Sequence, residues 1–318
     1  MISFRRLSKN SIIAAPIHNV TAPNAIQTSA QYDDLINVAG REGDFASVRR
    51  LLTERQSHGC LNTSNTFNFI ATNISALDDL LQNLAVLGGD WFARKNAHDA
   101  LVAQLAKLYR TADALRVVEV MAEKRYGATA ATFHPILNAL AHKKEMSAAW
   151  RVVDTMRARG FKPVPTSLNY ILTAYCFDGD VASAAKTVVK MEAYGMVADA
   201  ITYDALVLGA CRAGKVEAAV AVVRRMVGEG LPPLFSSHVH IIKEMVRRRY
   251  YALAVEYVRI FAGKDEKLDA ENFGYLVRRL RNGKRIAEAK SVVEEMARRG
   301  LPIDGGLKDL CLVNDIED

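Results

Sequence analysis

One alanine returns every 35 residues along the middle and C-terminal parts of the chain. Seven residues after each of these alanines stands a methionine, replaced once by phenylalanine. The alanines are Ala114, Ala149, Ala184, Ala219, Ala254 and Ala289, and the later residues are Met121, Met156, Met191, Met226, Phe261 and Met296. A period of about 20 to 50 residues is typical of arrays whose single units cannot bury their apolar faces alone. The spacing therefore predicts an array of stacked repeats.

The register of this array follows from placing the alanine at position 20 of each unit. It defines six units of 35 residues, and two upstream segments of 35 and 31 residues continue it. The eight predicted units, numbered 1 to 8 in chain order, are 29–63, 64–94, 95–129, 130–164, 165–199, 200–234, 235–269 and 270–304. Residues 305–318 are a short acidic tail.

Each unit is predicted to form two helices. Six units carry Ser, Thr or Asn at position 3, as in Thr202, and such side chains accept hydrogen bonds from the unpaired amides that open a helix. Glycine at the middle turn (Gly214) and at position 31 (Gly230) is typical of helix ends. A small alanine at position 20 lets the two helices approach closely, and methionine at position 27 fills irregular gaps. The prediction is an all-α fold, an α-solenoid with a long concave face.

Composition narrows the possible partners only a little. Lys and Arg exceed Asp and Glu by seven, which fits an anionic partner but is also common among organelle proteins. No apolar run approaches the roughly 18 residues that a membrane span needs, so none is expected.

The four cysteines form no metal or disulfide pattern. Cys60, Cys176, Cys211 and Cys311 include no Cys-x-x-Cys pair, so neither a zinc site nor a disulfide framework is indicated. Cys176 and Cys211 are themselves 35 residues apart, and we interpret them as small core residues in a reducing compartment.

The N-terminal segment 1–28 carries Arg5, Arg6 and Lys9 and no acidic residue. Acid-poor leaders that contain arginine and serine are typical of organelle transit peptides. We expect a mitochondrial address, because arginine and bulky apolar residues come early; a plastid address, or an ordinary disordered basic tail, is the alternative.

The repeats resemble those of the pentatricopeptide repeat family. The resemblance lies in the segments Ile201–Leu206, Ala213–Ala219, Met156–Pro163 and Glu294–Pro302, and in the period of 35 rather than the 34 of tetratricopeptide repeats. It is specific from 95 to 304 and weaker from 29 to 94. The resemblance implies a right-handed superhelix of the P type, without a catalytic C-terminal domain. It also implies an organelle protein that binds single-stranded RNA, about one base per repeat.

In that family the bases are read by the residues at positions 5 and 35, which we call a reading pair. The reading pairs carried over to this chain are Asp33 with Thr63, Asn68 with Arg94, Asp99 with Thr129, His134 with Val164, Asn169 with Asp199, Asp204 with Leu234, Val239 with Asp269, and Gly274 with Asp304. Only Asn169 with Asp199 matches a standard pairing, one that in the family favours uracil. The family usually has an aliphatic residue at position 2, and in this chain only unit 6 has a large aliphatic side chain there, Ile201. The residues expected to bind RNA are Asn169, Asp199, Ile201, Asp204, Asp99, Thr129, His134, Asp269 and Asp304; for most pairs, solvated polar helix starts are the alternative.

Basic residues gather in units 7 and 8. Of these, Arg248, Arg249, Arg281 and Lys284 are predicted to contact RNA phosphates without reading bases. The alternative is an exposed turn whose cations lie favourably near helix C-termini.

The sequence contains no catalytic signature. It lacks the His-x-Glu and Cys-x-x-Cys elements of a zinc deaminase, a Walker loop and a Rossmann glycine fingerprint. We therefore expect a protein without enzymatic activity, cofactor, metal or small-molecule substrate. The predicted function is RNA binding in the stabilisation, processing or translation of a transcript. The alternatives are a structural component of the mitochondrial ribosome and a protein-binding scaffold.

Overall fold

The computed structural model describes residues 28–72, 74–88 and 91–307. Regular secondary structure in these ranges is helical, without a strand. The α-helices are α1 (Ser29–Glu42), α2 (Phe45–Ser57), α3 (Leu77–Ala85), α4 (Trp91–Lys107), α5 (Thr111–Glu123), α6 (His134–His142), α7 (Met146–Ala158), α8 (Pro165–Asp178), α9 (Val181–Ala193), α10 (Ala200–Arg212), α11 (Val216–Gly228), α12 (Phe235–Arg247), α13 (Tyr251–Phe261), α14 (Glu266–Asn282) and α15 (Ile286–Arg298). Three short 3-10 helices are η1 (Asn68–Ala71), η2 (Ile74–Ala76) and η3 (Ala130–Phe133). Apart from Thr28, the predicted leader 1–28 lies outside the described residues, as does most of the tail 305–318.

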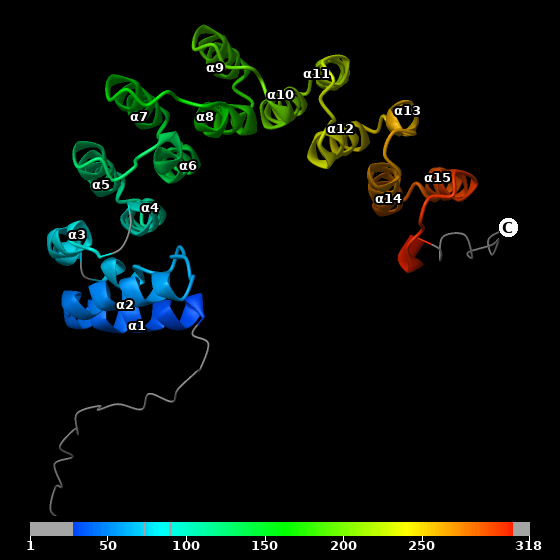
Figure 1. The fold of residues 1–318 in the computed structure, drawn as a ribbon. Helices are drawn as coiled ribbons and strands as arrows, with labels where there is room; N and C mark the ends of the chain where they lie inside the picture. The colour runs from blue at the N-terminus through cyan, green and yellow to red at the C-terminus, as the bar shows by residue number, and fades with distance from the viewer. Residues whose placement is uncertain (1–27, 73, 89–90, 308–318) are drawn as a thin grey trace, which may run out of the picture.

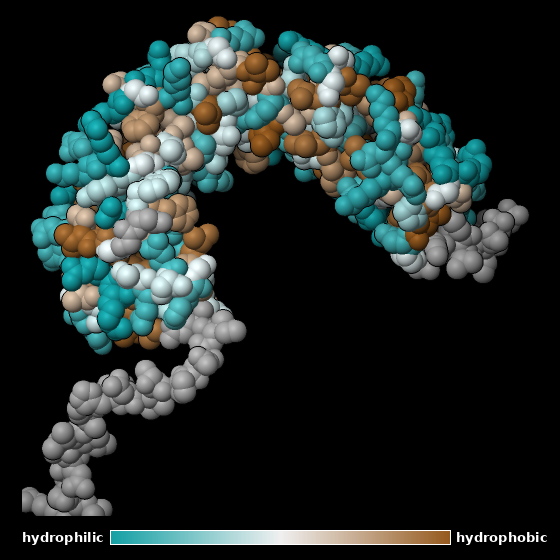
Figure 2. Space-filling view, viewed as in Figure 1, coloured by the Kyte–Doolittle hydropathy of each residue, from teal (hydrophilic) through white to brown (hydrophobic). Residues whose placement is uncertain are grey.

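The helices stack side by side into an arc (Figure 1). From α4 onward the first helix of each pair lies on the inner side of the arc and the second on the outer side. The space-filling view shows the same arch as a continuous body around an open concave face (Figure 2). The predicted all-α solenoid is confirmed. None of the described helices has the length and apolar character to cross a bilayer.

The alanines at position 20 are buried in the second helices, as the close approach of the paired helices requires. All six have exposed fractions of 2% or less, and so do the five methionines at position 27. The second helices of units 3 to 8 all begin at position 17, with Thr111, Met146, Val181, Val216, Tyr251 and Ile286. These six second helices thus present positions 20 and 27 to the core, with Phe261 of unit 7 only partly buried.

The turn between paired helices repeats one backbone conformation. Position 15 has a positive φ in seven units, a region that glycine enters without steric cost. Glycine holds it in units 1, 5 and 6, but larger residues hold it elsewhere: Tyr109, Lys144, Arg249 and Lys284.

Three first helices depart from the expected pattern. In unit 2 the segment before α3 forms η1 and η2 instead of an α-helix, because Asn37 of α1 hydrogen-bonds the backbone of this segment. Its Oδ1 accepts from the Phe69 amide (2.8 Å), and its Nδ2 donates to the Asn65 carbonyl (2.8 Å). Helices α4 and α14 begin four residues before the predicted units 3 and 8. In α14 the early start is capped by Asp265, whose Oδ1 accepts from the Leu268 amide (3.0 Å).

Candidate nucleic-acid interface

The hydroxyl at position 3 links neighbouring units. In units 5 and 6 the first helix begins at position 1, so the position 3 residue lies within its first turn and the preceding residue is the cap. The Thr202 hydroxyl accepts from the amide of that cap, Asp199 (3.3 Å), and also lies 2.9 Å from Oδ1 of Asn169 in the previous unit. Position 3 therefore ties a helix start to position 5 of the unit before it.

The same link recurs along the solenoid. A position 3 hydroxyl donates to a position 5 carboxylate in three further places, and in a fourth it meets a histidine nitrogen. The pairs are Thr66 with Asp33 (2.7 Å), Thr132 with Asp99 (2.9 Å), Ser237 with Asp204 (2.7 Å), and Ser167 with Nε2 of His134 (3.1 Å). Sequence reasoning identified both positions but missed the bond between them; their constant spacing of 33 residues was the available signal.

The reading pair of unit 5 is brought together. Nδ2 of Asn169 donates to Oδ1 of Asp199 (3.0 Å), and the same oxygen accepts from the Thr202 amide (2.8 Å). Burial alone would raise the pKa of Asp199, but the hydrogen bonds from Thr202 and Asn169 outweigh it and hold that pKa below its ordinary value. The carboxylate is therefore ionised at neutral pH, and it fixes the Asn169 amide with its NH₂ group toward Asp199.

A hollow of about 520 Å³ lies beside this pair, between α6, α8 and α10. Asn169 contributes to its lining together with Tyr170, Phe177 and Ile201, and Ile201 is 52% exposed. Asn138, His142 and Lys144 of the preceding unit complete the polar part of the lining. In the space-filling view, apolar residues reach the surface near the crown of the arch (Figure 2). The site thus combines a fixed polar pair with apolar surface.

Two other predicted pairs are joined only indirectly or not at all. Asp99 pairs with Lys95, and it is linked to Thr129 only through Thr132, whose hydroxyl accepts from the Thr129 amide (3.2 Å). His134 is half-buried, and desolvation lowers its pKa. It therefore faces this interface as a neutral ring.

Asp204 lies at the next helix start. It accepts hydrogen bonds from Ser236 (2.9 Å) and Ser237 (2.7 Å) and is not brought to a polar partner at position 35, which is Leu234.

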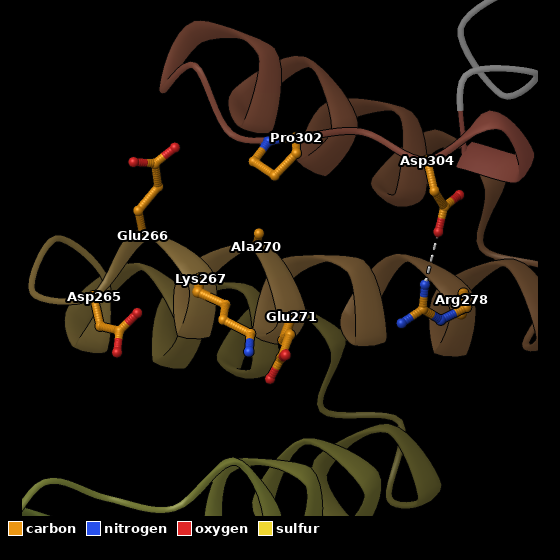
Figure 3. A pocket seen from close by; sticks show the side chains of 8 residues that line it. All are labelled: Asp265, Glu266, Lys267, Ala270, Glu271, Arg278, Pro302 and Asp304. Atoms are coloured by element: carbon orange, nitrogen blue, oxygen red, sulfur yellow. Dashed lines mark hydrogen bonds and ion pairs between the residues drawn. The ribbon is translucent and has the colours of Figure 1, made fainter.

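The last two reading pairs are not assembled. Asp269 is buried within the additional first turn of α14, where its Oδ2 accepts from the Gly263 amide (2.6 Å). Gly274 provides no side chain at position 5 of unit 8. Asp304 is exposed and forms an ion pair with Arg278 (3.1 Å). The two side chains point toward each other at one end of an open pocket of about 640 Å³, and Asp265 and Glu266 lie at its other end (Figure 3).

The first reading pair is occupied by an ion pair that sequence reasoning missed. Asp33 accepts from the Thr63 hydroxyl (2.5 Å) and from Nη1 of Arg55 (2.6 Å), and Arg55 is 1% exposed. The signal was present in the register, because Arg55 stands at position 27, where five other units have methionine.

Of the four predicted phosphate contacts, Arg248, Arg249 and Lys284 lie in the turns that follow α12 and α14, and Arg281 lies in the last turn of α14. Arg248, Arg249, Arg281 and Lys284 are all exposed. Arg248 binds Glu244 (2.7 Å), and Arg281 donates to the Gly306 carbonyl (3.1 Å). Within the described residues, no group of three or more His, Cys, Asp or Glu is arranged to hold a metal ion.

Comparison with known proteins identifies the repeats. A family model described as pentatricopeptide repeat-containing protein matches residues 79–191, and a PPR repeat model matches residues 194–227. Among solved structures, that of the pentatricopeptide repeat protein PPR10 in complex with an 18-nt psaJ RNA element covers 88% of this chain and 40% of its own, with 17% identity and a TM-score of 0.49.

Two Arabidopsis thaliana proteins align with almost the whole chain. The mitochondrial pentatricopeptide repeat-containing protein At2g40240 is 58% identical over 292 residues, which cover 91% of this chain and 83% of that protein. The mitochondrial protein At3g56030 of the same description is 46% identical over 297 residues, which cover 92% and 84%. Both names confirm the mitochondrion rather than the plastid. The chain belongs to the pentatricopeptide repeat family.

Proposed function

We propose that this protein binds single-stranded mitochondrial RNA along the concave face of the solenoid and acts in the stabilisation, processing or translation of a transcript. The observation that carries the proposal is the hydrogen bond between Asn169 and Asp199 beside the hollow of unit 5. The family membership supports it, because repeats of this family read about one RNA base each, through the residues at these two positions.

The polar groups of this pair favour particular base edges. Asn169 has two amide hydrogens and uses one on Asp199, so one donor remains. Oδ2 of Asp199 accepts from no other described side chain, so one acceptor remains. For a base whose exocyclic group points toward Asn169, a donor beside an acceptor complements the adjacent carbonyl and N–H of uracil or guanine, and opposes the amino group and ring nitrogen of cytosine or adenine. Uracil is the base that the family resemblance also implies.

The neighbouring apolar surface holds the ring of the base. Ile201 lies at position 2 and half of its side chain is accessible, so it can cover one face of a base next to the polar pair. The ring of Phe177 is instead covered by the guanidinium of Arg212, 4.3 Å from its centroid. Stacking at this site therefore depends on Ile201 and Tyr170.

The proposal is tested by fluorescence anisotropy with labelled oligouridine, oligoguanosine, oligocytidine and oligoadenosine at low salt. We expect oligouridine to bind most tightly, and Asn169→Ala to weaken its binding about tenfold, within the range of about 1–3 kcal/mol for a good bidentate base contact. Asp199→Ala is expected to do the same, but it also removes a helix cap.

Asp180→Ala is the matched control for that second effect. Asp180 caps α9 in the same manner, with its Oδ1 accepting from the Ser183 amide (3.0 Å), and it does not line the hollow. We expect the two variants to lose similar stability, about 0.5–2 kcal/mol each. Oligouridine affinity that falls equally in both, or wild-type protein that binds no single strand, would refute the proposal.

The proposed function is binding without catalysis. RNA incubated with the protein and any divalent metal should keep its length on a denaturing gel, and shortened products would contradict this part of the proposal. Crosslinking in mitochondria separates the regulatory role from the ribosomal alternative, since one enriched transcript site supports the former and ribosomal RNA the latter.

A further inference from the structure

The turns between the paired helices of units 6, 7 and 8 carry a surface that the groove does not explain. We call it the basic edge, and its cations are Arg212, Lys215, Arg247, Arg248, Arg249, Arg281, Lys284 and Arg285. The turns 212–215, 247–250 and 281–285 contain no acidic residue. The corresponding turns of units 1 and 5 are acidic instead, with Glu42, Asp44, Asp178 and Asp180. The turns of units 3 and 4 also carry cations, Lys107, Arg110, Lys143 and Lys144, so units 6 to 8 are the longest run of consecutive basic turns but not the only basic turns.

The three turns form one connected surface. The guanidinium of Arg248 lies against Gly214 of the preceding turn, so closely that a β-carbon there would collide with it. The Arg285 guanidinium lies 4.8 Å from the ring centroid of Tyr251, at the start of the preceding second helix. Arg248 and Arg285 each contact the unit before their own, so the neighbouring turns of the basic edge adjoin one another.

Two of these cations occupy a backbone conformation that favours glycine. Arg249 and Lys284 have φ values of 62° and 59°, while the equivalent residue of unit 6 is Gly214 with φ of 72°. Strained residues of this kind persist where the surrounding structure holds them, and Tyr109 and Lys144 have the same conformation in units 3 and 4. The turn therefore accepts a long side chain at position 15, and in units 7 and 8 that side chain is an exposed cation.

The same two cations, Arg249 and Lys284, pair with no acidic residue among those that the structure describes. Arg247 and Arg248 share the carboxylate of Glu244 (2.6 and 2.7 Å), and Arg285 pairs with Glu288. Arg249 and Lys284 are exposed and make no side-chain hydrogen bond or ion pair to any described residue. The basic edge thus keeps an excess of positive charge directed to solvent.

The basic edge suits phosphates and not bases. One face of the Tyr251 ring is covered by Arg285, and Tyr250 is the one exposed ring within these three turns, too few for a run of stacked bases. Position 5 is Val239 in unit 7 and Gly274 in unit 8, neither of which can hydrogen-bond a base edge. Duplex RNA hides its bases and is recognised through its backbone and shape.

We propose that the basic edge is a second RNA-binding surface, which holds the backbone phosphates of a duplex stem adjacent to the single-stranded segment in the groove. This rests on the proposed function, in that the groove supplies the single-stranded contact. The edge adds affinity for a structured RNA without adding sequence preference, because phosphate contacts carry no base information.

The test uses the double variant Arg249→Gly/Lys284→Gly in the full chain. Glycine is the residue that units 1, 5 and 6 have at this position, so the turn keeps its conformation and the melting temperature should not fall. Tyr109→Gly is the matched control: Tyr109 has the same position in unit 3 and a φ of 57°, but it carries no charge and does not line the hollow of unit 5.

Three RNAs serve as probes: an oligouridine strand, the same strand joined to a hairpin stem, and the same strand with a single-stranded extension of equal phosphate number. We expect the double variant to bind the hairpin RNA about tenfold less tightly than wild type, with the slope of log K against log salt smaller by about 2, roughly one per lost cation. Its affinity for plain oligouridine, and all affinities of Tyr109→Gly, should stay within about twofold of wild type.

Several results would overturn the proposal. These are an unchanged affinity for the hairpin RNA, an equal loss for the single-stranded extension, or a similar loss in Tyr109→Gly. Vesicles of anionic lipid that compete with the hairpin for wild type but not for the double variant would reassign the edge to a membrane surface. Failure of plain oligouridine to bind wild type, with hairpin binding still dependent on Arg249 and Lys284, would instead refute the groove function and leave the basic edge in place.

Discussion

The ion pair in unit 1 makes a sharp prediction about local stability. Arg55 stands at the methionine position of the repeat and is 1% exposed. Its Nη1 donates to Asp33 (2.6 Å) and lies 3.1 Å from the Thr66 hydroxyl, and its Nη2 donates to the Ser29 carbonyl (3.1 Å). Arg55→Met restores the residue that other units have at this position, yet we expect it to destabilise unit 1.

The magnitude follows from what the variant leaves behind. Removing one partner of a buried ion pair costs about 3–5 kcal/mol, because the remaining charge stays buried without a counter-ion. Asp33 keeps hydrogen bonds from the Thr63 and Thr66 hydroxyls, so the lower end applies, about 3 kcal/mol. In a repeat array this loss falls on the affected unit and its neighbour, since each unit contacts only adjacent units.

Hydrogen exchange followed by mass spectrometry resolves such a local loss. A change of about 3 kcal/mol corresponds to exchange roughly a hundredfold faster in the amides of α1 and α2, where each 1.4 kcal/mol is about tenfold. Met226→Leu, at the same position of unit 6, is the matched control and should cost less than about 1.5 kcal/mol.

Adding Asp33→Asn to Arg55→Met separates charge from packing. The amide removes the buried charge, so the double variant should exchange more slowly than the single one. If α1 and α2 exchange as in wild type after Arg55→Met, or if Asp33→Asn deepens the loss, the ion pair does not hold unit 1 together.

Two further changes test the packing and the protonation of the core. Gly209→Ala should cost about 1–3 kcal/mol in urea unfolding, because its β-carbon would lie 2.8 Å from Sγ of Cys176; Cys176→Ala should then recover part of the loss, and no recovery would disprove this contact as the cause. Burial lowers the pKa of His238 from 6.5 to about 4, so the unfolded chain binds the extra proton between these values. Stability should therefore be fully present above pH 6.5 and decline as pH falls to about 4, by about 3 kcal/mol. His238→Phe/Tyr257→Phe, which also removes the hydroxyl bonded to His238, should flatten this part of the profile of melting temperature against pH, and an unchanged slope would contradict the assignment.

The helical pairing was predictable because its cause is periodic. Alanine at position 20 and methionine at position 27 are buried where the second helices of units 3 to 8 pack on their partners. Their 35-residue spacing alone therefore predicts the paired helices of these units. The glycines of the turns report a backbone conformation in the same way, although Arg249 and Lys284 show that position 15 tolerates larger residues.

The starts of particular first helices were less predictable, since single side chains decide them. Asn37 draws the backbone of unit 2 into 3-10 turns from a neighbouring helix, a contact that spacing cannot report. The early start of α14 had a local signal: Asp265 replaces the expected glycine at position 31 and caps the helix. Both effects arise from hydrogen bonds rather than from the burial that sets the period.

A polar residue at position 5 is not by itself a sign of base reading. A hydroxyl of the next unit hydrogen-bonds the position 5 side chain in four units, at Asp33, Asp99, Asn169 and Asp204. A polar side chain at position 5 can therefore serve only to link neighbouring units. These four residues differ in whether the side chain keeps an unused hydrogen-bond donor for a base. A carboxylate has no hydrogen to offer, and that of Asp33 is already bound to a buried arginine, whereas the amide of Asn169 satisfies its neighbours and keeps one N–H. Recognition at this solenoid should therefore be strongest where an amide, and not an acid, occupies position 5, and in the assembled pairs that condition is met at unit 5.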